Sequence, residues 1–265
     1  MSTLRFSRKQ LCVPYALFLI CFVVAPLIVI IYYAFTNGEG QFSLENLTGF
    51  FTSPNTIGTL AYSFAIACVS TAAALLLAYP IAYILARSEW KKKSIIVMIF
   101  VLPMWINFTL RLTALKEVLT LIEHNLAYYP FLNSVIGMVY DFLPFMILPI
   151  YNSIARIKPD VIEAAKDLGA NSRIVLIRII FPLTLSGVIS GIVMVFVPAL
   201  TSFVISDLLG GGKVLLIGNV IEQEFMQGSN WNLGSGLSVV LMIFVIASMA
   251  VMNIFDKDQG GTAVW

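Results

Sequence analysis

The sequence of 265 residues is 59% hydrophobic and only 11% charged, whereas an ordinary soluble domain carries about 25% charged residues. Sixteen Lys and Arg and fourteen Asp and Glu could not cover the surface of a soluble chain of this length, which excludes most soluble enzymes and nucleic-acid-binding proteins. The net charge of +2 is too small to indicate a polyanionic partner, and the composition predicts a protein that lies mostly in a lipid bilayer.

Membrane-spanning helices are predicted wherever about 20 mostly apolar residues follow one another. Six stretches meet this requirement: residues 11–35, 57–86, 94–110, 134–151, 183–205 and 233–255. The first is too long for the apolar region of a signal peptide, about 7–15 residues, and we predict an uncleaved helix. The fourth is short and contains Pro144 and Pro149, which can interrupt a helix.

The basic residues predict the orientation of the chain. If the N-terminus is inside, thirteen of the sixteen Lys and Arg residues lie on the inner side, from Arg5 near the N-terminus to Lys257 near the C-terminus. The outer side keeps only Arg111, Lys116 and Lys213. The positive-inside rule then places both termini in the cytoplasm. Because the loops are too short to fold alone, we expect residues 1–265 to form one transmembrane domain.

Enzyme chemistry finds little support in the sequence. His124 is the only histidine, and the three cysteines lie in apolar runs without metal-ligand spacing. The run of three glycines before Lys213 is followed by Val214, not by the Ser or Thr of a phosphate-binding loop. We therefore expect no catalytic residue, no metal site and no cofactor.

The cytoplasmic loop at about 152–182 contains a predicted short helix. Pro159 suits a first helical position, Gly169 suits the position after the helix, and Val161, Ala165 and Leu168 form a narrow apolar stripe. A helix of this length cannot cross the membrane. Its residues alone are compatible with a docking element or with a plain connecting helix.

This loop resembles the EAA signature of the membrane subunits of ABC importers. Glu163-Ala164-Ala165 is followed after three residues by Gly169, and after nine more by Ile179-Ile180-Phe181-Pro182, where Phe181 replaces the usual Leu. The resemblance implies an all-α protein with six transmembrane helices and the type I ABC-importer permease fold. It also implies that the loop docks on an ATPase subunit through Glu163, Ala164, Ala165, Asp167 and Gly169.

Further stretches resemble the B-type permease subunits of spermidine/putrescine importers: residues 102–105, 111–112, 143–146, 164–170, 206–211 and 215–221. The resemblance implies an ATP-driven polyamine importer in the bacterial inner membrane. Its partners would be a related permease forming a heterodimer, two cytoplasmic ATPase subunits that hydrolyse the ATP, and an external polyamine-binding protein. No nucleic acid is expected as a partner.

Acidic and aromatic residues suit a cationic substrate, because carboxylates attract ammonium groups and ring faces add cation–π attraction. The candidate residues of the substrate path are Asp141, Asp207, Glu222, Glu224, Trp105 and Tyr140, with further ring faces from Phe108 and Phe203. Each has an alternative interpretation. Asp141 could pair with Arg111, Asp207 could tether the glycine-rich turn, Glu222 and Glu224 could be solvated loop charges, and Trp105 and Tyr140 could serve packing.

Two alternative functions remain open at this point. The chain could be a permease of the same importer class for another solute, such as an amino acid, sulfate or iron. It could also be a channel or carrier that works without ATP, in which case the inner helix would have no docking role.

Overall fold

The computed structural model describes residues 8–52, 54–88, 93–226, 228 and 230–257. Helices account for most of this part of the chain, and its β structure is one isolated bridge between Thr36 and Phe42. The predicted all-α class is confirmed. Among the basic residues used to predict the orientation, Arg5, Lys91 and Lys92 lie outside the described residues.

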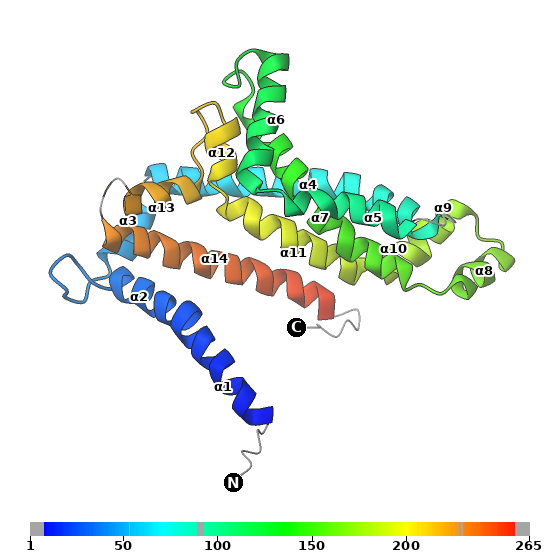
Figure 1. Cartoon of the computed structure of the whole chain (residues 1–265), viewed down its shortest axis with the longest axis horizontal. Helices are drawn as coiled ribbons and strands as arrows, with labels where there is room; N and C mark the ends of the chain where they lie inside the picture. Colours follow the sequence, from blue (N-terminus) through cyan, green and yellow to red (C-terminus); the bar gives the residue numbers. More distant parts are fainter. Residues whose placement is uncertain (1–7, 53, 89–92, 227, 229, 258–265) are drawn as a thin grey trace, which may run out of the picture. The chain divides into compact units, whose positions relative to one another are not determined.

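Two compact units divide the described chain, one within Met1–Ile57 and Val220–Phe244 and the other within Gly58–Asn219 and Val245–Trp265. The helices of the first unit are α1 (Arg8–Leu19), η1 (Ile20–Val24), α2 (Ala25–Ala34), α3 (Glu45–Thr52), the end of α13 (Ile217–Met226) and most of α14 (Trp231–Lys257). In Figure 1, α1 and α2 form one continuous helical rod, with η1 as a π-helical turn between them.

Two asparagine side chains hold the first unit together where α2 ends. Asn46 donates to the carbonyl oxygen of Thr36 at 2.8 Å, and Asn232 donates to the same oxygen at 2.6 Å. The same amides also reach the last turn of α2, where Asn46 donates to the carbonyl of Ala34 at 3.2 Å and Asn232 donates to that of Tyr33 at 3.3 Å. The last carbonyls of a helix have no partner within the helix, so these contacts satisfy groups that would otherwise be left unpaired. Gly236 permits the approach of α14, because a Cβ there would lie 2.7 Å from the carbonyl oxygen of Asn46.

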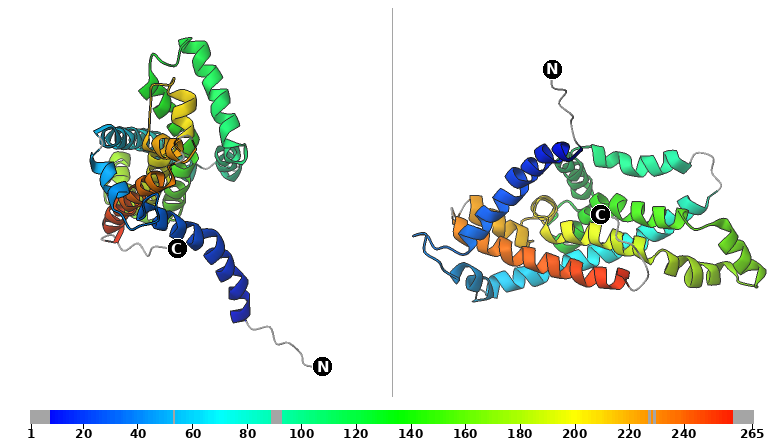
Figure 2. Two further views of the ribbon diagram at one scale, coloured as in Figure 1. Left: turned by 90° about the vertical axis from the view of Figure 1, so that its left-hand side faces the viewer. Right: turned by 90° about the horizontal axis from the view of Figure 1, so that it is seen from below.

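The second unit contains the remaining helices: most of α4 (Pro54–Arg87), α5 (Lys93–Val101), η2 (Leu102–Trp105), α6 (Phe108–Glu123), α7 (Pro130–Ala155), α8 (Pro159–Asp167), α9 (Ser172–Ile174), η3 (Val175–Ile180), α10 (Phe181–Leu183), α11 (Leu185–Thr201) and α12 (Val204–Leu209). Helices α7 and α11 lie side by side at its centre (Figures 1 and 2). Glycines allow this contact: a Cβ on Gly187 would lie 2.7 Å from the carbonyl oxygen of Pro149, and one on Gly191 would lie 2.7 Å from Sδ of Met146.

Four of the six predicted spans are continuous helices long and apolar enough to cross a membrane. They are Val13–Ala34, Thr56–Arg87, Pro130–Ala155 and Trp231–Met252. The span predicted at 134–151 is longer than expected, and Pro144 and Pro149 lie inside α7 without ending it. Proline is tolerated in membrane helices because neighbouring groups can satisfy the freed carbonyls.

The third and fifth predicted spans belong to bent pairs of helices, a feature that the predicted residue ranges did not include. Ile95–Trp105 is followed by Phe108–Glu123 at an angle of 96°, and Ser172–Leu183 by Leu185–Thr201 at 65°. Pro103 and the extended backbone of Ile106 end the first segment, and the Asn107 side chain caps α6 by accepting from the backbone N–H of Thr109 at 2.9 Å. Counting each bent pair as one span gives six.

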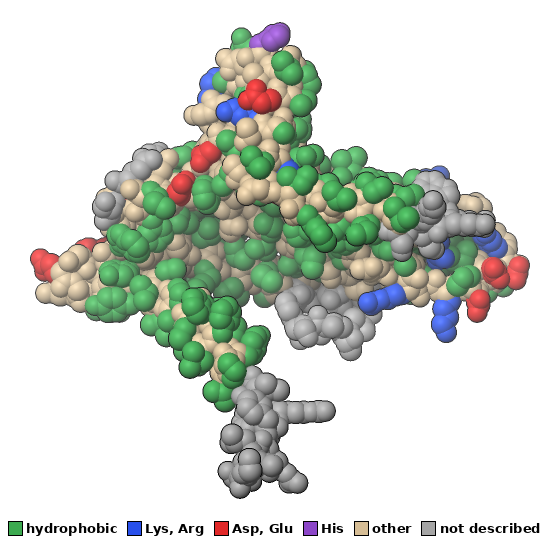
Figure 3. All heavy atoms as spheres, in the orientation of Figure 1, with side chains coloured by type: hydrophobic (Ala, Val, Ile, Leu, Met, Phe, Trp, Pro, Cys, Tyr) green, Lys and Arg blue, Asp and Glu red, His purple; other side chains and the backbone are tan. Residues whose placement is uncertain are grey.

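The exterior of the protein carries large apolar side chains. None of the residues in the most apolar stretch of Val13–Ala34 is buried, and Leu76 on α4 is 76% exposed. Figure 3 shows many hydrophobic side chains on the visible face of α2 and of the coloured part of α1. Exposed apolar surface on this scale is unfavourable in water but matches a hydrocarbon environment, as the composition predicts.

Candidate functional site

Helix α8 has the form predicted for the cytoplasmic loop. Pro159 occupies its first position, and Gly169 follows its end with φ of +85°. The backbone N–H of Ala170 donates to the carbonyl of Ala165 at 3.0 Å and that of Gly169 donates to Lys166 at 2.8 Å, which is the Schellman arrangement. The left-handed backbone at Gly169 is therefore required by the way the helix ends.

The exposed side of α8 differs from the predicted apolar stripe. Of the three stripe residues only Ala165 is buried, whereas Val161 is 42% exposed and Leu168 is 89% exposed. Ala165 is 8% exposed, so it contributes little to the surface of α8 in this chain, and its predicted docking role stays a prediction. Of the other residues expected to dock, Glu163, Ala164, Asp167 and Gly169 are exposed.

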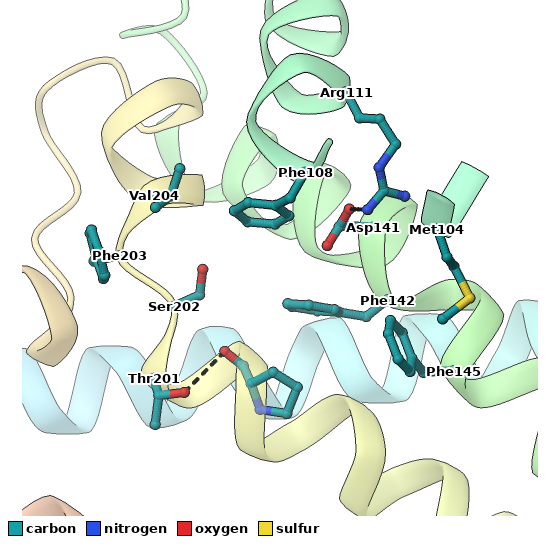
Figure 4. A pocket seen from close by; sticks show the side chains of 11 residues that line it. Met104, Phe108, Arg111, Asp141, Phe142, Phe145, Thr201, Ser202, Phe203 and Val204 are labelled. Atoms are coloured by element: carbon teal, nitrogen blue, oxygen red, sulfur yellow. Dashed lines mark hydrogen bonds and ion pairs between the residues drawn. The ribbon is translucent and has the colours of Figure 1, made fainter. Parts of the chain in front are cut away.

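A cavity of about 480 Å³ lies where the bend before α6, the middle of α7 and the break between α11 and α12 meet (Figure 4). Its apolar wall comprises Met104, Phe108, Phe142, Phe145, Pro198, Phe203 and Val204. Its polar lining comprises Arg111, Asp141, Thr201 and Ser202. A volume of this size is typical of small-molecule sites, in which apolar walls surround a few polar groups.

An ion pair between Arg111 on α6 and Asp141 on α7 lies at this cavity. Both side chains are buried, with relative exposures of 7% and 3%. The predicted alternative, in which Asp141 pairs with Arg111, is thus confirmed. Nε and Nη1 of Arg111 are buried and have no hydrogen-bond partner among the described residues. The guanidinium therefore uses only one of its nitrogen atoms for pairing.

The aromatic residues around the cavity are only partly those predicted. Phe108 and Phe203 line it, as expected for ring faces along the path. Trp105 is 82% exposed and Tyr140 is 45% exposed, and neither belongs to the lining. Phe142 and Phe145 take their place. Phe145 lies four residues after Asp141, a same-face spacing that the sequence contained, whereas the position of Phe142 directly after Asp141 gave no such signal.

Asp207 lies on α12, where it accepts a hydrogen bond from Nδ2 of Asn219 at 2.5 Å. Asn219 is buried and ties this region together, because its Oδ1 accepts from Oγ of Ser206 at 2.7 Å and from the backbone N–H of Leu216 at 2.9 Å. Partial burial raises the pKa of the Asp207 carboxyl above its ordinary value. This hydrogen bond is a contact of the kind expected if Asp207 tethers the glycine-rich turn. Part of the Asp207 side chain is nevertheless exposed.

The remaining predicted acids, Glu222 and Glu224, lie on α13 in the first unit, and both are half-buried. Neither forms an ion pair with a described residue. Close to them in sequence, Trp231 makes an edge-on contact with Phe225, with ring centroids 5.4 Å apart. Within the described residues, no three His, Cys, Asp or Glu side chains gather as metal ligands.

The comparisons with known proteins identify the class to which this fold and site belong. Residues 78–258 match the family described as binding-protein-dependent transport system inner membrane component, and the chain belongs to that family. It is therefore a multi-pass permease subunit of an ABC transporter in the inner membrane.

Among curated relatives, the chain is similar to the spermidine/putrescine transport system permease protein PotB of Haemophilus influenzae, with 35% identity over 247 residues, or 86% of each chain. The Escherichia coli PotB is also 35% identical, over 245 residues that cover 85% of this chain and 89% of that relative. Among solved structures, a bacterial alginate ABC transporter has a chain with a TM-score of 0.74 and 14% identity, covering 97% of this chain and 96% of its own. At this identity, the likeness supports the fold alone.

Proposed function

We propose that this chain is the permease subunit of an ATP-driven importer of spermidine and putrescine. The observation that carries the proposal is 35% identity, along most of both chains, to spermidine/putrescine permeases. The cavity adds chemical support, because it combines one carboxylate with several ring faces. A carboxylate balances an ammonium group, while aromatic faces attract the cation and shelter the methylene chain of a polyamine.

The proposal includes the partners of the chain. A related permease completes the translocation path, an external binding protein delivers the polyamine, and two cytoplasmic ATPase subunits supply energy. We assign the docking on the ATPase to the exposed residues of α8, with the charge of Glu163 and the exposed Leu168 at its end as the groups that a partner can contact. The orientation with both termini in the cytoplasm, which places α8 on the ATPase side, is part of the same proposal.

Uptake measurements test the substrate. In cells without polyamine import, the complete transport system with and without this chain is supplied with labelled putrescine and spermidine, and ATP is depleted in a parallel sample. We expect uptake that needs both the chain and ATP, and that unlabelled polyamine suppresses. Uptake of an amino acid, sulfate or iron instead of polyamines would contradict the proposed substrate. Uptake that survives ATP depletion would contradict the ATP-driven mechanism.

A further inference from the structure

The ion pair between Arg111 and Asp141 is poorly built for a purely structural role. A buried ion pair repays the cost of leaving water only when its remaining donors and acceptors are also satisfied. Arg111 contacts Asp141 through Nη2, but its buried Nε and Nη1 have no partner among the described residues. Releasing Asp141 therefore breaks a single contact of the guanidinium and not a network.

The carboxylate of Asp141 is accessible from the cavity. One of its oxygens faces Arg111, and Figure 4 shows the other turned toward the space between the rings of Phe108 and Phe142. An ammonium group that enters this space would meet an anionic oxygen between two aromatic faces. This combination recognises alkylammonium ions.

The opposite wall of the cavity offers a second, weaker site for a cation. Helix α11 ends there at Thr201, and the C-terminal end of a helix carries partial negative charge. The Thr201 hydroxyl already donates to the carbonyl of Val197 at 3.1 Å. The Ser202 hydroxyl points into the cavity in Figure 4 and has no hydrogen-bond partner among the described residues. A molecule with two separated amines can use both walls, whereas a monoamine cannot.

We propose that Arg111 is a tethered counter-ion, which an ammonium group of the polyamine displaces from Asp141 during passage. The inference rests on the proposed function. It adds that Asp141 binds the ammonium group and that Arg111 competes with the substrate for Asp141. In the absence of substrate, Arg111 neutralises the buried carboxylate, so Asp141 does not stand uncompensated in a low-dielectric site. When the substrate arrives, its ammonium takes over that neutralisation. The displaced guanidinium keeps its own positive charge, so the total charge of the site rises by the full charge of the polyamine, which favours a short stay and onward passage.

Three variants separate this exchange from a structural ion pair: Asp141→Asn, Arg111→Gln and the double variant, each in the complete transporter. We expect Asp141→Asn to raise the apparent KM for polyamine uptake about tenfold or more, because the ammonium loses its anionic partner. Arg111→Gln should lower KM or leave it unchanged, because the competitor is gone. The double variant buries no unpaired charge, so it should assemble like the parent protein yet transport as poorly as Asp141→Asn.

Matched controls lie on the same helix as Arg111. Lys116→Gln and Glu117→Gln each remove one charge from α6 outside the cavity lining, and we expect both to transport normally. A second measurement needs no transport: the purified complex in detergent is heated with putrescine, spermidine or 1-butylamine. The two polyamines should raise the melting temperature of Arg111→Gln more than that of the parent protein, 1-butylamine should have a smaller effect, and Asp141→Asn should respond to none of them.

Several results of these experiments would contradict the displacement of Arg111 by the substrate. Normal uptake by the double variant would show that the pair only supports packing, and a loss of uptake in Arg111→Gln equal to that in Asp141→Asn would contradict displacement. If Arg111→Gln does not assemble, polyamine present during solubilisation should restore assembly, and failure to do so would overturn the proposal. A parent transporter that imports no polyamine would instead contradict the proposed function, which distinguishes the two failures.

Discussion

Asp141 and Asp207 are the same residue type in different surroundings, and they differ in burial and in the partner of the carboxylate. Asp141 is buried, and its negative charge is paired with the positive charge of Arg111. Asp207 is exposed, and the neutral amide of Asn219 holds its carboxylate in place at 2.5 Å. A hydrogen bond from an amide orients a carboxylate without neutralising it. Among the described residues no Lys or Arg pairs with Asp207, so in the proposed substrate path its carboxylate is available to a cation.

Asp207→Asn tests that attraction. The substituted amide keeps an oxygen that can accept from Asn219, so the tether survives while the charge is lost. We expect polyamine uptake to fall about tenfold, as befits the loss of a charge contact of about 1–4 kcal/mol, with normal amounts of assembled protein. Asn219→Ala is the converse control, because it removes the tether and should lower the melting temperature of the complex. Near-normal uptake by Asp207→Asn would leave Asp207 with a tethering role alone.

At the scale of single elements, α8 shows how a local ending can prepare a docking surface. The Schellman arrangement at Gly169 turns the chain sharply and leaves Leu168 almost fully exposed at the end of the helix. A single exposed leucine is ordinary on a protein surface, so the exposure of Leu168 makes this end of α8 available to the proposed partner without requiring one.

Gly169→Val tests whether this ending matters for coupling. A Cβ at Gly169 meets no atom within 4 Å, so the substitution acts only through the left-handed backbone, at a cost of at least about 1 kcal/mol. We expect normal membrane insertion, about fivefold or more weaker recovery of the ATPase with the purified permease, and reduced uptake.

Gly40→Val is the matched control for this test. Gly40 has φ of +78° and also has no atom within 4 Å of a built Cβ, but it lies in the loop before α3. It should carry the same backbone strain and leave ATPase recovery unchanged. Equal losses in the two variants would indicate general destabilisation and would remove the specific role of α8.

At the scale of the whole molecule, the proposed orientation in the membrane rests on the distribution of Lys and Arg and can be tested directly. Single cysteines at Gln41 and Ser172, both exposed positions, are introduced into a background without Cys12, Cys21 and Cys68. On intact cells, an impermeant thiol reagent should label the cysteine at Gln41 and should label the one at Ser172 only after the cells are opened. The reverse pattern would invert the proposed topology and would place α8 on the wrong side for an ATPase.

Features that depend on neighbouring residues along the chain were predictable from the sequence. Apolar run length predicts the membrane helices, and proline at the start and glycine after the end predict α8, because hydrocarbon burial and backbone geometry act locally. The bends at Thr184 and near Ile106 were not predicted, since both predicted spans remain apolar across the break. At both bends the residues before and after the break are apolar, so hydropathy does not show that one helix ends and another begins.

The cavity and its ion pair required the tertiary structure. Arg111 and Asp141 are thirty positions apart, and only the bend before α6 and the packing of α6 on α7 bring them into contact. The contacts of Asn219 with Ser206 and Asp207 likewise join separate helices. Composition determined that this protein lies in lipid, because transfer from water depends on the sum of its side chains. Packing decided which charges meet inside it, because electrostatic pairing depends on distance in space and not on separation along the chain.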